Sequence, residues 1–214
     1  LRLRAGLLLG CAFMTGLALR LGAGEEPRQA TGLKIGEVTD TAALVWMRVT
    51  EKAARNALGG LDGADSKALE GACPGAPGRA RVRYGTTEDL ANAQATDWKD
   101  AAAEADFAVR FKLEGLQPAT RYHFAAETSG PGGAPAHGAL RGSFQTAPPA
   151  DRRAGVTFTV TTGQAYRSRD DAARGFKMYD VMAKLKPHFL VHTGDIVYYD
   201  NDPPNATSLS MARY

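Results

Sequence analysis

Apolar and polar side chains alternate along several short segments between residues 31 and 147. The strictest alternation puts an apolar residue at every second position, at Phe107, Val109, Phe111 and Leu113. Because successive side chains of a strand point to opposite faces, this segment has one wholly apolar face. Similar β-rich runs occupy Ala42–Val49 and Ala80–Tyr84. The pattern predicts an all-β region that is interrupted by a long Ala- and Gly-rich loop over Glu51–Gly78.

A turn followed by an early strand tyrosine stands in the second half of this region. The motif consists of Leu116, Pro118, Thr120, Tyr122 and Phe124. In a corner of this kind the tyrosine hydroxyl hydrogen-bonds back to the turn. On these residues the region resembles a fibronectin type III domain, with Trp46 expected in the core and Arg141–Thr146 as the last strand. The resemblance implies a β-sandwich that acts as a scaffold or a substrate rim.

The hydrophobic period changes after residues 148–155, whose Pro- and Arg-rich composition is that of a linker. The expected order is a strand at Val156–Val160, a loop at Thr161–Ala165, a helix that ends before Pro187, and a strand at Phe189–His192. Asp170 or Asp171 is expected to cap the helix. Its apolar stripe consists of Phe176, Tyr179, Met182, Ala183 and Leu185.

A strand, a helix and a second strand in this order form a βαβ unit with parallel strands. Such a unit brings the Gly163–Gln164 loop and Asp195 to the same end of one sheet. Open α/β sheets bind ligands beyond the carboxyl ends of their strands. We therefore expect a site where these two loops meet.

Gly194, Asp195 and Tyr198 follow directly after the second of these strands. A glycine before a carboxylate lets an ion approach closely, and a phenol three positions later offers a second hard oxygen. The combination indicates a metal site. The alternative is a Gly-Asp turn beside packed tyrosines, which is common turn chemistry. His192 in the strand itself is either a support for the site or a core histidine.

The first 24 residues have the order of a secretory signal peptide: Arg2 and Arg4, an apolar stretch over Ala5–Leu19, and then small residues. The apolar stretch is shorter than the roughly 20 residues that span a bilayer, so no transmembrane anchor is expected. A weak lipoprotein-like box at Cys11 is the alternative. If the signal peptide is removed, Cys73 is the only cysteine that remains in the exported chain, which excludes an internal disulfide. The product is expected in the periplasm, at the cell surface or secreted.

Composition narrows the function classes further. The chain has 214 residues, of which 44% are hydrophobic and 23% charged, and a net charge of +3. These values are typical of a globular protein with one or two domains. The basic residues are dispersed along the sequence, and no arginine-rich run indicates nucleic-acid binding. The composition does not define the oligomeric state.

Three segments together resemble the PhoD-like alkaline phosphatases and phosphodiesterases of the metallophosphoesterase superfamily. They are Gly36–Val49, which is similar to the opening strands of that family, Thr162–Tyr166, and the strand with Gly-Asp-x-x-Tyr over Pro187–Tyr198. The resemblance implies a phosphoric ester hydrolase that acts on mono- or diesters outside the cytoplasm. It also implies iron and calcium as cofactors, with Asp195 as the bridging ligand and Tyr198 as an iron ligand.

One position departs from the family. The cysteine whose thiolate would bind iron falls on Gly163, which has no side chain, and this weakens the iron assignment. Purple acid phosphatases also join a fibronectin-like domain to a Gly-Asp-x-x-Tyr site, but their earlier aspartate would fall on Thr161. Either another residue, such as Gln164 or a later aspartate, replaces the missing ligand, or this branch of the family binds metal weakly. The donor set predicted from the sequence is therefore Asp195, Tyr198 and Gln164.

The resemblance predicts three parts after the signal peptide. Residues 25–147 form the N-terminal β-sandwich, residues 148–155 the linker, and residues 156–214 the first βαβ part of an α/β metallophosphoesterase sandwich. One βαβ unit cannot bury both faces of its sheet, so we expect the 214-residue chain to be an inactive fragment of a longer enzyme. The alternatives are a secreted binding protein with a degenerate metallophosphoesterase domain and a purple acid phosphatase-like enzyme.

Overall fold

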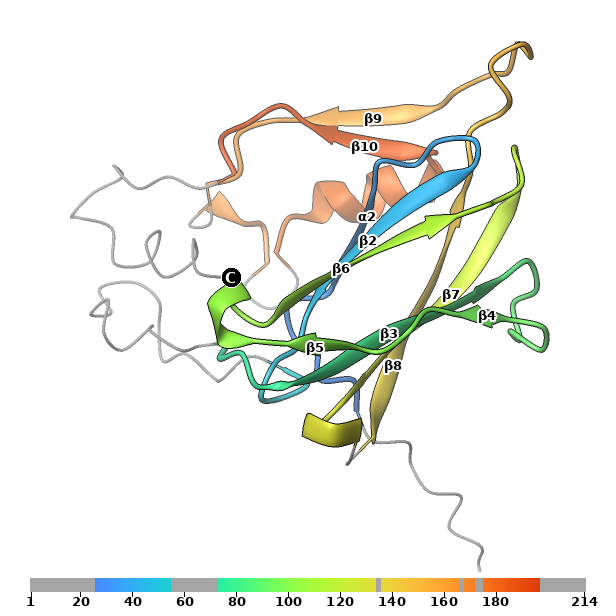
Figure 1. Cartoon of the computed structure of the whole chain (residues 1–214). Coiled ribbons are helices and arrows are strands. Elements are labelled where there is room, and N and C mark those ends of the chain that lie inside the picture. The colour runs from blue at the N-terminus through green and yellow to red at the C-terminus, as the bar shows by residue number, and fades with distance from the viewer. Residues whose placement is uncertain (1–25, 55–72, 134–135, 166–167, 172–174, 197–214) are drawn as a thin grey trace, which may run out of the picture.

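The computed structural model describes residues 26–54, 73–133, 136–165, 168–171 and 175–196. The expected signal peptide, most of the loop after residue 54, and Tyr198 lie outside these residues. In the described part, strands dominate up to residue 145. A shorter part with two strands and one helix follows (Figure 1).

Two antiparallel sheets form the first part. One sheet has the order β1-β2-β6, built from Leu33–Gly36, Ala42–Arg48 and Ala108–Glu114. The other has the order β4-β3-β7-β8 with β5 paired to β3, built from Gln94–Ala95, Gly78–Gly85, Arg121–Ser129, Ala136–Gln145 and Lys99–Ala101. Short 3-10 turns lie at Ala103–Ala105 (η1) and Pro131–Gly133 (η2). The predicted β-sandwich is confirmed.

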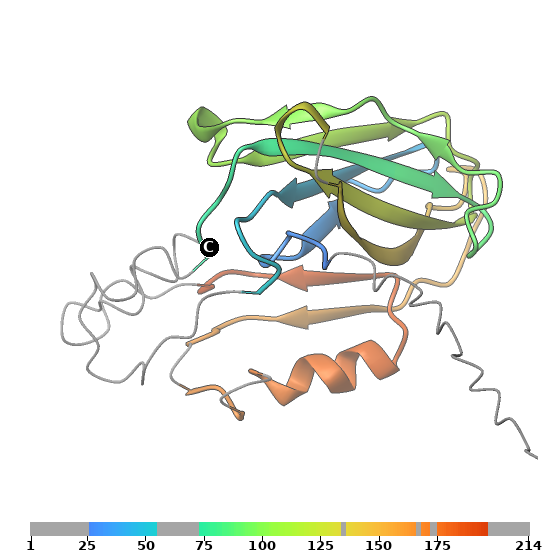
Figure 2. The same ribbon diagram turned by 90° about the horizontal axis from the view of Figure 1, so that it is seen from below.

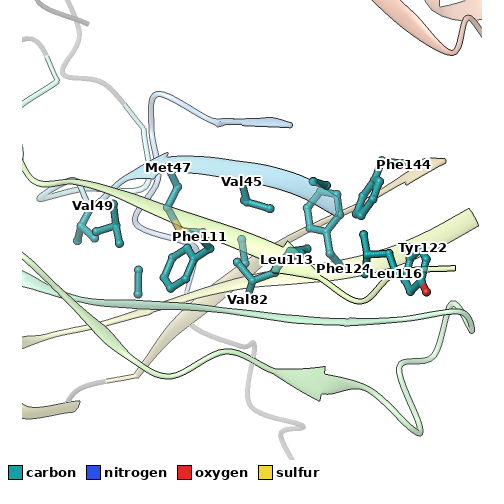
Figure 3. Close-up of a cluster of buried hydrophobic side chains, with 14 of the residues drawn as sticks. Val45, Met47, Val49, Val82, Phe111, Leu113, Leu116, Tyr122, Phe124 and Phe144 are labelled. Carbon is teal, nitrogen blue, oxygen red and sulfur yellow. The ribbon is translucent and has the colours of Figure 1, made fainter. Parts of the chain in front are cut away.

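The core of the sandwich comes from alternate positions of both sheets, as the sequence pattern predicts. Val45, Met47, Phe111 and Val82 are at most 1% exposed and lie between the sheets (Figure 3). Phe124 and the aromatic rings of Tyr122 and Phe144 close one end, where the last two stack with centroids 5.7 Å apart. Burial of such side chains is the main term that stabilises the sandwich.

The expectation that Trp46 lies in the core is wrong. Val45 and Met47 are fully buried, and Trp46 between them is only half-buried. Because side chains alternate along β2, the two neighbours take the inner face and Trp46 takes the outer one, opposite Arg110 and Lys34 in the register.

The tyrosine corner is present where the sequence predicts it. The backbone N–H of Gln117 donates a 2.9 Å hydrogen bond to the hydroxyl oxygen of Tyr122. Thr146 closes the same corner, since its hydroxyl donates to the carbonyl oxygen of Gln117 at 2.6 Å. The start of β7 and the end of β8 are thereby fixed to the turn before them.

A buried arginine holds the opposite end of the sandwich. The Arg48 guanidinium donates to the Asp106 carboxylate at 2.9 and 3.1 Å and to the carbonyl oxygen of Cys73 at 2.7 Å. Asp106 and Phe107 have positive φ angles of 50° and 58°, so the chain turns sharply into β6. A side chain at Gly75 would overlap Phe107. The network attaches the returning segment of the β2–β3 connection to the sheet.

The second part contains two parallel strands and the helix between them. β9 is Phe158–Thr161, α2 is Lys177–Lys184 and β10 is Phe189–His192, the strand that the sequence predicts. Figure 2 shows α2 on one side of the strand pair. The carboxyl ends of β9 and β10 point the same way.

The helix ends before Pro187 as predicted, but its start differs from the prediction. It begins at Lys177, later than a cap at Asp170 or Asp171 would place it, and Phe176 is the N-cap residue. The Asp170 carboxylate nevertheless accepts a 2.9 Å hydrogen bond from the N–H of Lys177. The predicted stripe is only partly covered, because Leu185 is 63% exposed and no residue of α2 is buried.

Large apolar side chains are exposed in this second part. Of the described residues, all eight large hydrophobics that are strongly exposed lie between residues 156 and 196: Val156, Phe158, Val160, Val181, Leu185, Phe189, Leu190 and Ile196. Phe158 and Phe189 pair in the register and stack at 5.2 Å on the face that does not carry Thr161 and His192. Within the described residues, this face of the β9–β10 pair is therefore exposed.

Candidate metal centre at the carboxyl ends of β9 and β10

The loops that follow β9 and β10 are joined by backbone hydrogen bonds. Thr193 N–H donates to the carbonyl oxygen of Thr161 at 2.9 Å, where the strand pairing ends. Beyond it, the Gly163 N–H donates to the carbonyl oxygen of Gly194 at 3.3 Å, and the Gln164 N–H donates to the carbonyl oxygen of Asp195 at 2.8 Å. The structure thus brings the Gly163–Gln164 loop next to Asp195.

The backbone of these loops takes left-handed conformations at three positions. The φ angles are 67° at Gly163, 131° at Gly194 and 56° at Asp195. Glycine adopts such angles without strain, and aspartate tolerates the left-handed region better than most residues. The two glycines therefore permit the loops to approach each other, and Asp195 lies immediately after the second of them.

The side chain of Gln164 has a partner on the helix. The Tyr179 hydroxyl donates a hydrogen bond to Gln164 Oε1, so α2 orients the amide that follows β9. Burial raises the pKa of the Tyr179 phenol, which keeps it in the donating form. An amide oxygen has two lone pairs, and one of them remains for a second donor or a cation.

Asp195 is exposed, and it is the carboxylate that the sequence assigns to the metal. It is the only acidic residue in the described part of the loop after β10, which ends at Ile196. Tyr198, the other expected oxygen ligand of this loop, lies outside the described residues. The structure therefore brings together two of the three predicted site residues, Asp195 and Gln164.

His192 is directed to the helix side of the strand pair. It shares a face with Thr161, whose hydroxyl contacts Met178 Sδ of α2 at 3.8 Å. The N–H of Gly194 donates to His192 Nδ1 at 3.3 Å, and His192 Nε2 is buried with no partner among the described residues. His192 therefore supports the backbone of the loop at Gly194.

The described donors near Asp195 suit one of the two expected metals better than the other. Across the described ranges, no three side chains of His, Cys, Asp or Glu gather as a metal-binding group. The available donors are the oxygens of Asp195 and Gln164, which suit a hard cation such as calcium. They do not fit the iron site that the resemblance implies, because Gly163 has no thiolate to offer.

Sequence reasoning missed the role of Tyr179. It stands in the predicted helix stripe, where an aromatic residue is normally read as packing. The signal was its phenol, since a half-buried tyrosine hydroxyl requires a partner. In the βαβ arrangement, the first turn of the helix faces the loop that follows the first strand, and Gln164 is the polar side chain there.

Comparisons with known proteins place the chain in a family. The sequence model of the family described as "PhoD-like phosphatase, N-terminal domain" matches residues 17–148. No curated protein gives a significant match. A solved structure titled "Structure of PhoD" matches with 19% identity and a TM-score of 0.60 over 80% of this chain and 28% of that chain. This chain therefore spans less than a third of the length of that protein.

The fn3 domain of the human collagen alpha-1(XX) chain matches with 17% identity and a TM-score of 0.36, over 62% of this chain and 95% of that one. The sixth fibronectin type III domain of a human fibronectin type III domain containing protein matches with 16% identity and a TM-score of 0.37. It covers 61% of this chain and 95% of that one. No helix in the described part of the chain is both long and apolar enough to cross a membrane.

Proposed function

This chain belongs to the PhoD-like phosphatase family, and from that premise we propose that its polypeptide hydrolyses phosphate mono- or diesters with the help of metal ions. The observation that carries the proposal is the hydrogen bond between Gln164 and Asp195. This backbone bond joins the loop that carries Gln164 to the loop that carries the exposed Asp195, at the carboxyl ends of two parallel strands, where open α/β sheets bind ligands.

The proposed ligands are Asp195, Gln164 and Tyr198, with calcium as the metal that the first two suit. When bound, metal ions would neutralise charge on the ester and polarise its phosphorus–oxygen bonds. In this chain, Asp195 supplies the negative charge that attracts a cation. The Tyr179 hydroxyl donates to the Gln164 amide oxygen and so restricts its orientation. The described residues do not supply an iron site, so iron would need ligands from other residues.

We propose that activity requires polypeptide beyond the residues described. The support is the apolar surface of the second part, where Phe158 and Phe189 are about half exposed. A stable α/β layer covers both faces of its sheet. The strand pair also offers two ligands, whereas a catalytic metal centre has at least three from the protein. We expect the 214-residue chain to be inactive alone.

Export is the proposed location. Its support is the order of charged, apolar and small residues over positions 1–24. The substrate would then be a phosphate ester outside the cytoplasm. Cleavage near residue 24 in a secreting host, read by N-terminal sequencing, would agree with this proposal, and retention of the segment in the cell would contradict it.

The test uses the complete natural protein and two aspartate variants. Hydrolysis of bis-p-nitrophenyl phosphate and of p-nitrophenyl phosphate is followed before and after chelation, with calcium and iron added back. Asp195→Asn should lower kcat by at least about 100-fold, since it removes a charged ligand. Asp151→Asn, an exposed residue of the linker, should leave the rate unchanged. Equal activity of both variants would refute the proposed role of Asp195.

A secreted binding protein is the second candidate. The observation that favours it is Gly163, which offers no side chain where the family carries a cysteine. In that case the complete protein would bind no metal, would hydrolyse neither ester, and would be unaffected by Asp195→Asn.

A further inference from the structure

Three arginines occupy alternate positions of β3, a central strand of the second sandwich sheet. Arg79, Arg81 and Arg83 face outward, while Ala80 and Val82 between them are fully buried. Residues two apart on a strand are about 6.7 Å apart, so the three arginines begin at regular intervals along one line of the sheet. The dispersed basic residues of the sequence are thus aligned by the strand period.

The neighbouring strands add two more arginines to the same outer face. Arg83 pairs with Ala125 of β7, which in turn pairs with Arg141 of β8. Arg121 lies four positions before Ala125 on β7 and therefore shares its face. We name the five residues Arg79, Arg81, Arg83, Arg121 and Arg141 the arginine face.

Two carboxylates on the strands of this sheet share the face and neutralise part of its charge. Glu127 pairs with Arg81 at 2.6 Å and lies 3.7 Å from Arg83, and Asp100 pairs with Arg79 at 3.1 Å. Five arginines against two carboxylates leave a formal charge of +3 on this face.

The other two arginines of the face, Arg121 and Arg141, have no carboxylate partner among the described residues. The Arg121 guanidinium donates to the Ser143 hydroxyl at 3.2 Å and reaches Gln145 Oε1 at 3.5 Å. Within the described part of the chain, neither Arg121 nor Arg141 forms a salt bridge, and both are exposed. Their guanidinium groups keep donors for an external anion.

Trp98 gives the face an aromatic element. The Arg81 guanidinium lies over the Trp98 ring at 4.6 Å from its centroid. Stacking of this kind holds a guanidinium in a fixed orientation and lowers the entropy lost when an anion binds. Arg81 is therefore ordered from two sides, by Trp98 and by Glu127.

The arginine face is remote from the candidate metal centre. Figure 1 shows β3, β4 and β5 at the bottom of the molecule and the β9–β10 pair at the top, with β2 and β6 between them. A ligand on the arginine face consequently does not compete with one at Asp195. The surface is a second site and not an extension of the first.

We propose that the arginine face binds a linear polymer with repeated phosphate groups. Guanidinium groups bind phosphate with two parallel hydrogen bonds, and a line of them suits an extended polyanion better than a single small ion. The arginine face itself indicates that the surface binds a polyanion. That the anionic groups are phosphates rests on the proposed function. The surface would keep the protein close to a phosphate-rich polymer while hydrolysis takes place elsewhere.

The test measures binding of long-chain inorganic polyphosphate to the whole chain in the presence of chelator, so that hydrolysis plays no part. The double variant Arg121→Gln/Arg141→Gln should raise Kd about tenfold and reduce the slope of log K against log salt by about 1.4, for two lost phosphate contacts. The control is Lys34→Gln/Arg110→Gln, which removes the same charge from exposed residues of the other sheet. It should change Kd less than about twofold.

Three outcomes would overturn the proposal. Equal losses in the two double variants would mean that only net charge matters. Absence of polyphosphate binding at low salt would refute the site. Binding to phosphatidylglycerol vesicles without binding to polyphosphate would identify a membrane surface instead. Circular dichroism of both variants establishes that the sandwich is intact. A protein that binds polyphosphate but hydrolyses neither ester would contradict only the catalytic proposal.

Discussion

The backbone N–H of Gln164 donates a 2.8 Å hydrogen bond to the carbonyl oxygen of Asp195, which joins the loop after β9 to the loop after β10. The two residues are 31 positions apart in the sequence, and the parallel pairing of the strands brings them together. The positive φ angles of Gly163 and Gly194 permit this approach. The proposed metal centre depends on this contact.

Tyr179→Phe is expected to loosen Gln164 without changing the fold of the strand pair. The variant removes the hydroxyl that donates to Gln164 Oε1. If Gln164 is a ligand, calcium affinity of the complete protein should fall about tenfold, as for other residues that orient ligands. Isothermal titration measures this, with Tyr84→Phe in the sandwich as the control. An unchanged affinity would show that Gln164 does not bind the metal.

Alkaline pH should act in the same way as this substitution. Burial raises the pKa of the Tyr179 phenol, so its stabilising contribution is complete below the ordinary pKa and is lost as the pH rises through the higher folded value. Hydrogen exchange at the side-chain amide of Gln164 should therefore be slower in wild type than in Tyr179→Phe below about pH 10. Above that pH the difference between the two proteins should disappear. The same alkaline dependence in Tyr179→Phe would contradict this assignment.

Tyr122→Phe should destabilise the sandwich by about 1 kcal/mol, because the half-buried N–H of Gln117 loses its acceptor. Tyr84→Phe is the matched control. The Tyr84 hydroxyl donates to Gln94 Oε1 at 3.1 Å in an exposed position, so its removal should cost less than about 0.5 kcal/mol. Urea unfolding followed by Trp fluorescence measures both. Equal effects would mean that the corner does not stabilise the fold.

Arg48→Lys should cost about 2 kcal/mol of unfolding free energy. A lysine cannot replace the fork that reaches both Asp106 and the Cys73 carbonyl oxygen, and the site is buried. Arg79→Lys changes an exposed pair with Asp100 and should cost less than about 0.5 kcal/mol. Urea titrations of the two variants are compared directly. A small loss in Arg48→Lys would show that the network is dispensable.

Much of the sandwich follows from the sequence because strand alternation is a local property. Val109, Phe111 and Leu113 are buried as predicted, and Tyr122 forms its corner. Trp46 was misplaced because a large aromatic was assigned to the core on resemblance, although Val45 and Met47 on either side already filled the inner positions.

The rest depends on contacts between distant segments. The start of α2 could not be predicted, because the Asp170 carboxylate binds the N–H of a residue seven positions later and not that of the next turn. The arginine face was missed because Arg83 and Arg141 become neighbours only through the pairing of β3, β7 and β8. The Gln164–Asp195 contact was expected from the βαβ order, and the part played by Tyr179 was not.

Asp89 should make one turn of the sandwich sensitive to acid. Its carboxylate accepts hydrogen bonds from the N–H of Ala91 at 3.0 Å and from the hydroxyl of Thr87 at 2.7 Å, and these bonds lower the pKa of Asp89. The contribution is present above the unfolded pKa and is lost as the pH falls through the lower folded value. In Asp89→Asn, the free energy of unfolding should therefore fall less steeply as the pH is lowered than in wild type. Asp97→Asn is the control, and urea unfolding at several pH values measures both.

The most direct test of the central claim is the metal content of the complete natural protein, determined by elemental analysis of wild type, Asp195→Asn and Asp151→Asn. We expect calcium in near-stoichiometric amount in wild type and in Asp151→Asn, and its loss in Asp195→Asn. A wild-type protein without metal, or an Asp195→Asn variant that keeps the full amount, would contradict a metal centre at the carboxyl ends of β9 and β10.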